Sequence, residues 1–184
     1  MTVRKHTRPY ARLTIAVGAL AGAMFVPTTS AVAGSDDLGT ARAATARYHN
    51  IARAEAAGYG LFTDASGIAC IDNPGVGGMG IHHVDGDLVG DPGIDVARPE
   101  ALVYEPRHDG RLHLVGIEYI VLQSSWEDAG NTTRPSLFGK PFHLVESPNR
   151  YGLDPFYELH AWLWKHNANG MFDDWNPRVS CPAA

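Results

Sequence analysis

The chain has 184 residues, enough for one domain with a sizeable hydrophobic core. Its 20 Asp and Glu outnumber its 15 Lys and Arg, so the formal net charge is −5. An acidic chain of this kind lacks the basic surface that nucleic acids and anionic membranes require, and we expect neither as a partner.

The N-terminal residues 1–33 have the pattern of a secretory signal peptide. Four basic residues and no acidic residue come first, an uncharged apolar run follows at 13–26, and Ala31-Val32-Ala33 is a small-x-small cleavage motif. The apolar run is shorter than the about 20 residues that a membrane anchor needs. We therefore expect residues 34–184 to be a single secreted, extracellular domain that contacts no membrane after cleavage. Without the four basic residues, 11 Lys and Arg face 20 Asp and Glu, a formal net charge of −9.

Cys70 and Cys181 are the only cysteines of the chain. In an exported protein a single pair of this kind is expected to form a disulfide. Closing a loop of about 110 residues stabilises a fold by about 4–5 kcal/mol on chain-entropy arguments. The alternative is two free thiols, one of them a metal ligand. Cys181 has no His or Cys close in sequence, which disfavours this alternative.

One helix is predicted within residues 35–60. Ser35 or one of the two Asp residues after it can cap the start, where acidic residues also suit the positive end of a helix. The interior is rich in Ala, Arg and Glu, which are good helix formers. Its narrow apolar stripe recurs every three or four residues, so we expect the helix to pack closely against a sheet.

Short apolar and β-branched runs, separated by Gly-rich and Pro-rich turns, predict strands in the rest of the chain. The predicted strands are 79–84, 101–104, 112–122, 142–145 and 157–164. The run 112–122 is long and apolar on both faces, which indicates a central strand. The predicted fold class is α+β, with an antiparallel or mixed sheet and one N-terminal helix packed on it. Closure of the sheet into a barrel is left open.

Residues 156–166 have features of both helix and strand. Asp154-Pro155 resembles an N-cap followed by a first helical turn. The aromatic residues that follow, and the Asn-Ala-Asn-Gly turn after them, favour a strand. We predict a strand, in which four side chains share one face: Glu158, His160, Trp162 and Trp164.

His82 and His83 are consecutive, and a strand directs consecutive side chains to opposite faces. His82 would share its face with Gly80, which leaves space beside an imidazole. His83 would share its face with Met79 and Ile81, which are typical of core packing. We therefore choose His82 as the site residue.

Glu118 lies in the predicted central strand, in line with five small or apolar residues: Leu112, Leu114, Gly116, Ile120 and Leu122. A lone carboxylate buried there is unfavourable unless it has a cation, a hydrogen-bond partner or a raised pKa. The sequence leaves two partners possible for this carboxylate. One is a metal ion, and the other is an arginine such as Arg98 or Arg107 in a structural salt bridge.

His82, Glu118 and His160 come from three predicted strands and form a candidate set of two imidazoles and one carboxylate. Such a set leaves coordination positions open, as catalytic zinc and non-haem iron sites require. The cofactor predicted is one transition-metal ion (Zn, Cu, Fe or Mn), with no other cofactor expected. His143 is a further candidate, as a fourth ligand or in place of Glu118. The sequence has no HExxH and no compact Cys/His motif.

Two interpretations need no metal. Trp162 and Trp164 would line an aromatic-rich pocket for a small molecule, which makes the chain a non-enzymatic ligand-binding protein. In the other interpretation the His and Trp side chains only pack, and the chain is a structural protein of the cell envelope. The sequence indicates no substrate and no reaction, so whether the chain is an enzyme is left open.

Distinctive segments occur along the chain after the signal peptide: GGMGIHHV, RPEALVYEP, LVGIEYIV, SLFG and YELHAWLWKHNANGMFDDWNPRVSC. With these segments the chain resembles a family of exported bacterial single-domain proteins of uncharacterised function, over most of its length. The resemblance implies an exported single-domain protein. It implies no activity, cofactor or site residue.

Overall fold

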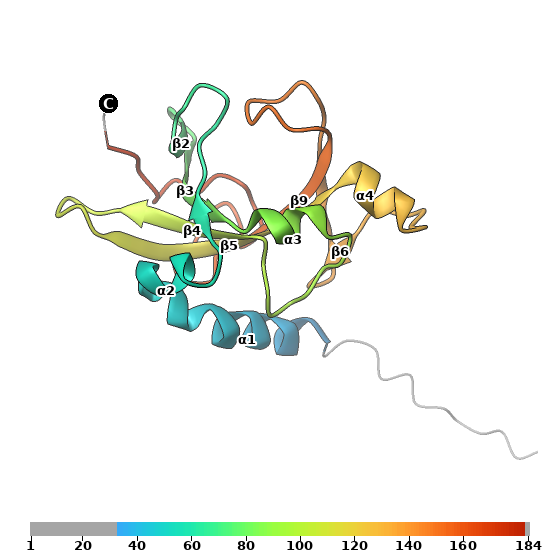
Figure 1. Cartoon of the computed structure of the whole chain (residues 1–184). Coiled ribbons are helices and arrows are strands. Elements are labelled where there is room, and N and C mark those ends of the chain that lie inside the picture. The colour runs from blue at the N-terminus through green and yellow to red at the C-terminus, as the bar shows by residue number, and fades with distance from the viewer. Residues whose placement is uncertain (1–32, 183–184) are drawn as a thin grey trace, which may run out of the picture. The chain divides into compact units, whose positions relative to one another are not determined.

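A computed structural model of the chain describes residues 33–182, which belong to one compact unit (Figure 1). The predicted signal peptide, except for Ala33, lies outside the described residues. The helices are α1 (Ala33–Thr45), the 3-10 helix η1 (Ala46–His49), α2 (Ile51–Glu55), α3 (Gly86–Gly90) and α4 (Gln123–Asp128). The strands are β1 (Gly60–Leu61), β2 (Cys70–Asn73), β3 (Gly77–Val84), β4 (Ala101–Pro106), β5 (Leu112–Leu122), β6 (Ser136–Leu137), β7 (Lys140–Pro141), β8 (His143–Val145) and β9 (Phe156–Ala161).

Seven of the strands form one antiparallel sheet in the order β1-β3-β4-β5-β9-β8, with β2 beside β1 on the same edge of β3. Of the two arrangements predicted from the sequence, antiparallel or mixed, the sheet has the antiparallel one. β8 and the β1/β2 edge have no pairing with each other, so the sheet is open and the barrel considered above is not formed. β5 lies near the middle of the order and pairs with β4 and β9. The prediction of a central strand is therefore also confirmed.

The N-terminal helical region differs from the single helix predicted for residues 35–60. It consists of α1, η1 and α2, and the interruption falls at Asn50. The Asn50 side chain accepts a hydrogen bond from the amide of Ala52, which caps α2 and competes with continuation of the preceding helix. Ala41 and Tyr48 of this region are buried in the main hydrophobic cluster, together with residues of one sheet face. Within residues 33–182, no helix has both the length and the apolar content of a membrane span.

The sheet has two differently packed faces. We call the face that carries Leu102, Ile117 and Leu159 the helix face, because these residues share the main cluster with Ala41 and Tyr48. The opposite face, which we call the site face, carries Glu118 and His160 and two smaller apolar clusters. In Figure 1, α1 and α2 lie below the sheet.

The alternation of side chains along β5 reverses at Val115. Val103 pairs with Gly116 and Tyr104 pairs with Leu114, so Val115 is an extra residue in β5 and forms a β-bulge. Leu112 and Leu114 consequently belong to the helix face. Regular alternation had placed them on the face of Glu118, and this part of the prediction is wrong.

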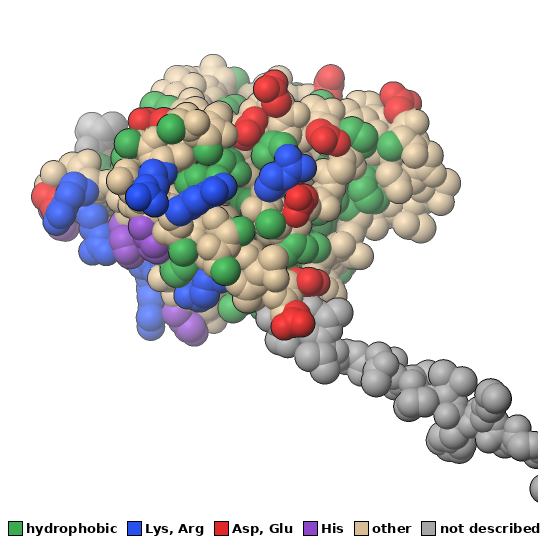
Figure 2. Space-filling model, turned by 60° about the horizontal axis from the view of Figure 1, so that its bottom comes forward, with side chains coloured by type: hydrophobic (Ala, Val, Ile, Leu, Met, Phe, Trp, Pro, Cys, Tyr) green, Lys and Arg blue, Asp and Glu red, His purple; other side chains and the backbone are tan. Residues whose placement is uncertain are grey.

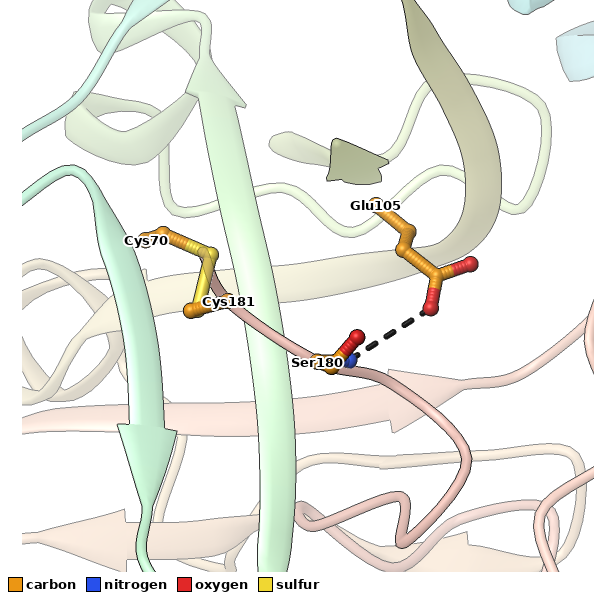
Figure 3. The surroundings of a disulfide bond; sticks show 4 residues. All are labelled: Cys70, Glu105, Ser180 and Cys181. Carbon is orange, nitrogen blue, oxygen red and sulfur yellow. Dashed lines mark hydrogen bonds between the residues drawn. A yellow bond between two sulfur atoms is a disulfide. The ribbon is translucent and has the colours of Figure 1, made fainter. Parts of the chain in front are cut away.

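The C-terminal segment after β9 lies against β3. An isolated bridge pairs Gly78 with Asn176, and a Cβ at Gly77 would lie 2.6 Å from the carbonyl of Asn176. The predicted disulfide is confirmed, since Cys181 is bonded to Cys70 of β2 (Figure 3). Beside the bridge the amide of Ser180 donates to the buried carboxylate of Glu105 at 3.4 Å. These contacts attach the segment to the sheet at several points.

Charged side chains are unevenly distributed on the face turned towards the viewer in Figure 2. Lys, Arg and His lie mostly on the left of this view, and Asp and Glu lie mostly along its top and down its centre. Two arginines of the N-terminal helical region pack on aromatic rings. The Arg42 guanidinium lies 4.5 Å from the ring centroid of Trp164, and that of Arg47 lies 4.6 Å from the ring centroid of Tyr48.

The disulfide closes a loop with a sequence separation of 111. We expect the double variant Cys70→Ser/Cys181→Ser to lose about 4 kcal/mol of unfolding free energy, because the unfolded chain is no longer constrained. Urea unfolding followed by Trp fluorescence measures this loss. Wild type in reducing buffer should match the variant, and equal stability of the oxidised wild type and the variant would contradict the prediction.

Glu100 is a buried acid next to β4, and its carboxylate accepts a hydrogen bond from the amide of Ile120 at 2.9 Å. Burial raises the pKa of Glu100 from 4.5 to about 8. Between these values the folded state holds a proton that the unfolded chain has lost, so stability falls as the pH rises. Between pH 5 and pH 8 we expect the unfolding free energy of the wild type to fall by about 3 kcal/mol relative to that of Glu100→Gln, which has no carboxyl group to titrate at this position. Urea unfolding at both pH values tests this, and parallel changes in the two proteins would contradict it.

Candidate metal centre

His82, Glu118 and His160 lie together on the site face. Glu118 of β5 and His160 of β9 are direct cross-strand partners. β4 separates β3 from β5, and the β4 residue opposite Glu118 is Ala101. His82 lies opposite Val103 of β4, so its imidazole crosses β4 diagonally, past the small side chain of Ala101, to reach the Glu118 carboxylate.

The distances within this group suit one metal ion. Nε2 of His82 is 3.3 Å from Oε2 of Glu118 and 3.5 Å from Nε2 of His160. Nδ1 of His160 is 3.7 Å from Oε1 of Glu118. One ligand atom from each residue lies within 4.8 Å of the other two. Tetrahedral bonds of about 2.0–2.1 Å hold ligand atoms about 3.3 Å apart, close to the separations around His82.

All three side chains are buried, with exposed fractions of 5% for His82, 4% for Glu118 and 1% for His160. Burial lowers the pKa of His82 to about 4, although the charge of Glu118 acts in the opposite direction. His82 is therefore a neutral imidazole at neutral pH, the form that binds metals. Burial also lowers the pKa of His160, but Glu118 and Asp174 outweigh it and the net change is upward.

His82, and not His83, faces the site. The His83 ring lies against Tyr104 on the helix face, with ring centroids 5.3 Å apart. The role expected of Gly80 is different from the one found. Gly80 has a φ of +96°, and a Cβ there would lie 2.5 Å from the carbonyl oxygen of Tyr104. Glycine is thus required for the close approach of β3 and β4, and it provides no space for a ligand.

The salt bridge proposed between Glu118 and an arginine is not formed. Within residues 33–182, the ion-pair partners of Glu118 are His82 and His160. Arg98 pairs instead with Asp95, and Arg107 contacts His113. The buried carboxylate therefore has two imidazoles as neighbours and no permanently charged cation.

A cavity of about 400 Å³ borders the group. His82, Glu118, Glu158 and Tyr151 contribute its ionisable side chains. Most of the other lining residues are apolar, including Phe62, Val84, Val89, Ile120, Leu153 and Phe156. The volume lies within the range of about 300–1,000 Å³ that is typical of small-molecule sites. A molecule in this cavity would have an apolar environment and direct access to two of the three candidate ligands.

Three further ionisable residues lie next to the group. Oδ1 of Asp174 is 3.6 Å from Nδ1 of His160. His143 of β8 lies beside Glu158 and Asp174, at 3.8 Å and 3.6 Å, so it forms a group with them and is not a fourth ligand of the first set. Glu158 was placed on the correct face, but its role and that of Asp174 were missed. Asp174 lies in a loop, which has no helical or strand periodicity from which the direction of its side chain could be predicted.

Trp162 and Trp164 lie on different faces of the sheet, because β9 ends at Ala161. The Trp162 ring stacks on His160, with centroids 5.9 Å apart, and its N–H donates to the carbonyl of Asp173. Trp164 lies under Arg42, at the helix face. The shared face predicted for the two indoles is wrong. Neither lines the cavity described above, and their ligand-binding role stays a prediction.

Comparisons with protein-family models, curated proteins and solved structures give no match. The resemblance to a family of exported bacterial proteins therefore stays a prediction.

Proposed function

We propose that the chain binds one transition-metal ion through His82, Glu118 and His160 and presents it to a small molecule in the adjoining cavity. The convergence of these three buried side chains from three strands carries the proposal. A carboxylate without an Arg or Lys partner is costly to bury, and a cation between the carboxylate and the two imidazoles offsets this cost.

The set of two nitrogen donors and one oxygen donor suits Zn²⁺, Fe²⁺, Mn²⁺ and Cu²⁺. Three protein ligands leave at least one coordination position for water or for a bound molecule. An ion held there would act as a Lewis acid or lower the pKa of a bound water. The residues present do not select among reactions, and we assign none.

Two observations support an extracellular location for this protein. The disulfide between Cys70 and Cys181 is typical of an oxidising compartment. Residues 1–33 have the order of basic, apolar and small segments that directs export. The segments that resemble exported bacterial proteins agree with this location.

The apolar lining of the cavity favours a second candidate function, the non-enzymatic binding of a small molecule. Here the two imidazoles and Glu118 would serve as hydrogen-bonding groups beside an apolar pocket. The two functions differ in one measurable respect, which is whether binding of the small molecule requires a metal ion.

Metal binding by the first group is tested with protein stripped by a chelator and then titrated with Zn²⁺, Mn²⁺, Fe²⁺ or Cu²⁺. We expect His82→Ala and His160→Ala each to weaken binding of the preferred ion by at least about 100-fold, since loss of an outer-shell contact alone costs about 10–100-fold. Calorimetry gives the affinities, and elemental analysis gives the amount of metal retained.

His108→Ala is the matched control, because it also removes one imidazole but from an exposed position. Its affinity should equal that of wild type. If His82→Ala binds the ion as tightly as this control does, the proposed site is wrong. Unfolding midpoints of all three variants show whether a loss of binding is a loss of fold.

The cavity is tested with hexanoate, whose carboxylate suits the ion and whose alkyl chain suits the apolar lining. We expect Val89→Trp to weaken hexanoate binding by at least about 10-fold, because the indole occupies part of the cavity. Val76→Trp, at a side chain 44% exposed and outside the cavity lining, should bind as wild type does. Calorimetry with and without metal separates the two functions, since equal affinity in both states would favour the second.

A further inference from the structure

A second group of potential ligands lies beside the first on the site face. His143, Glu158 and Asp174 each offer one ligand atom within 4.8 Å of the other two. Nδ1 of His143 is 3.8 Å from Oε1 of Glu158 and 3.6 Å from Oδ2 of Asp174. The side-chain exposures are 65% for His143, 4% for Glu158 and 26% for Asp174. This group therefore opens to solvent, whereas the first group is buried.

The pairing of β5, β9 and β8 places the two groups next to each other. His143 is the cross-strand partner of Glu158, and Glu118 is the cross-strand partner of His160. Glu158 and His160 are two residues apart in β9 and so point to the same face, about 6–7 Å apart at their Cα atoms. One strand thus supplies one ligand to each group.

Asp174 connects the two groups through its two carboxylate oxygens. Oδ1 lies 3.6 Å from Nδ1 of His160 in the first group, and Oδ2 lies 3.6 Å from Nδ1 of His143 in the second. Neither separation is a hydrogen bond, and Nδ1 of the buried His160 has no hydrogen-bond partner among the described residues. A buried nitrogen without a hydrogen bond, next to a carboxylate, fits a cation bound between the two groups.

The charges of the combined cluster also require an explanation. It contains three carboxylates, those of Glu118, Glu158 and Asp174. Among residues 33–182, each of them has only imidazoles as ion-pair partners. A cation bound among them would offset the mutual repulsion of these carboxylates.

We propose that His143, Glu158 and Asp174 bind a second divalent cation, so that the site face holds a two-metal centre linked by Asp174. The proposal rests on the proposed function, since it adds a second ion to the site formed by His82, Glu118 and His160. The second ion, with one exposed imidazole and two carboxylates, is bound more weakly than the first.

The number of ions bound per chain tests this proposal. Zn²⁺ is titrated calorimetrically into the metal-free protein, and we expect two ions per chain, the second bound more weakly. His143→Ala should retain the first ion with unchanged affinity and weaken the second by at least about 10-fold. Because His143 is 65% exposed, this variant should fold as wild type does. His166→Ala removes another exposed imidazole and should bind both ions.

Mn²⁺ provides a spectroscopic readout, because two adjacent Mn²⁺ ions give an exchange-coupled electron paramagnetic resonance signal. Wild type should show this signal, and His143→Ala should show that of a single ion. A wild type that binds one ion, lost in His82→Ala and kept in His143→Ala, overturns the second site and leaves the first intact. A wild type that binds no ion, or whose only ion is insensitive to His82→Ala, overturns both.

Discussion

The burial of the Glu118 carboxylate in the middle of the sheet is the constraint on which the site face depends. A carboxylate with 4% exposure is stable only if neighbouring strands bring it polar partners. β9 supplies His160 directly opposite, and β3 supplies His82 over the small side chain of Ala101. Both partners are imidazoles. An Arg or Lys side chain at either position would instead neutralise the Glu118 charge with a permanent positive charge. The His82 imidazole, which is neutral at neutral pH, leaves the carboxylate able to accept a further cation.

Alternation along strands correctly predicted the faces of the three candidate ligands of the first group. His82, Glu118 and His160 all lie in stretches where the pairing of strands is regular, so each side chain points where a period of two places it. Alternation also separated His82 from His83, but the choice of His82 relied on space beside Gly80 that the structure does not provide. The order of the strands could not be derived in this way, and it is this order that brings three segments distant in sequence together. The sequence predicted which face each residue occupies, and tertiary structure determined which residues meet.

The failures have local causes that a repeating pattern does not contain. One extra residue at Val115 reverses the alternation of β5 and moves Leu112 and Leu114 to the helix face. β9 stops at Ala161, so that Trp162 and Trp164 diverge. Asp174 was missed because it reaches the site from a loop, whose path depends on contacts with β3. A few tertiary contacts determine where a bulge, a strand end or a loop falls. The two-residue alternation of side chains in the sequence does not indicate these positions.

The covalent bond at the C-terminus also bears on the loop that carries Asp174. Asp174 precedes Cys181 by seven residues, and the chain between them is fastened to β3 and, through Cys181, to β2. Without the disulfide, the Gly78–Asn176 bridge and the hydrogen bond from Ser180 to Glu105 would still hold this tail non-covalently. The disulfide therefore adds a covalent limit on how far the Asp174 carboxylate can move from His143 and His160.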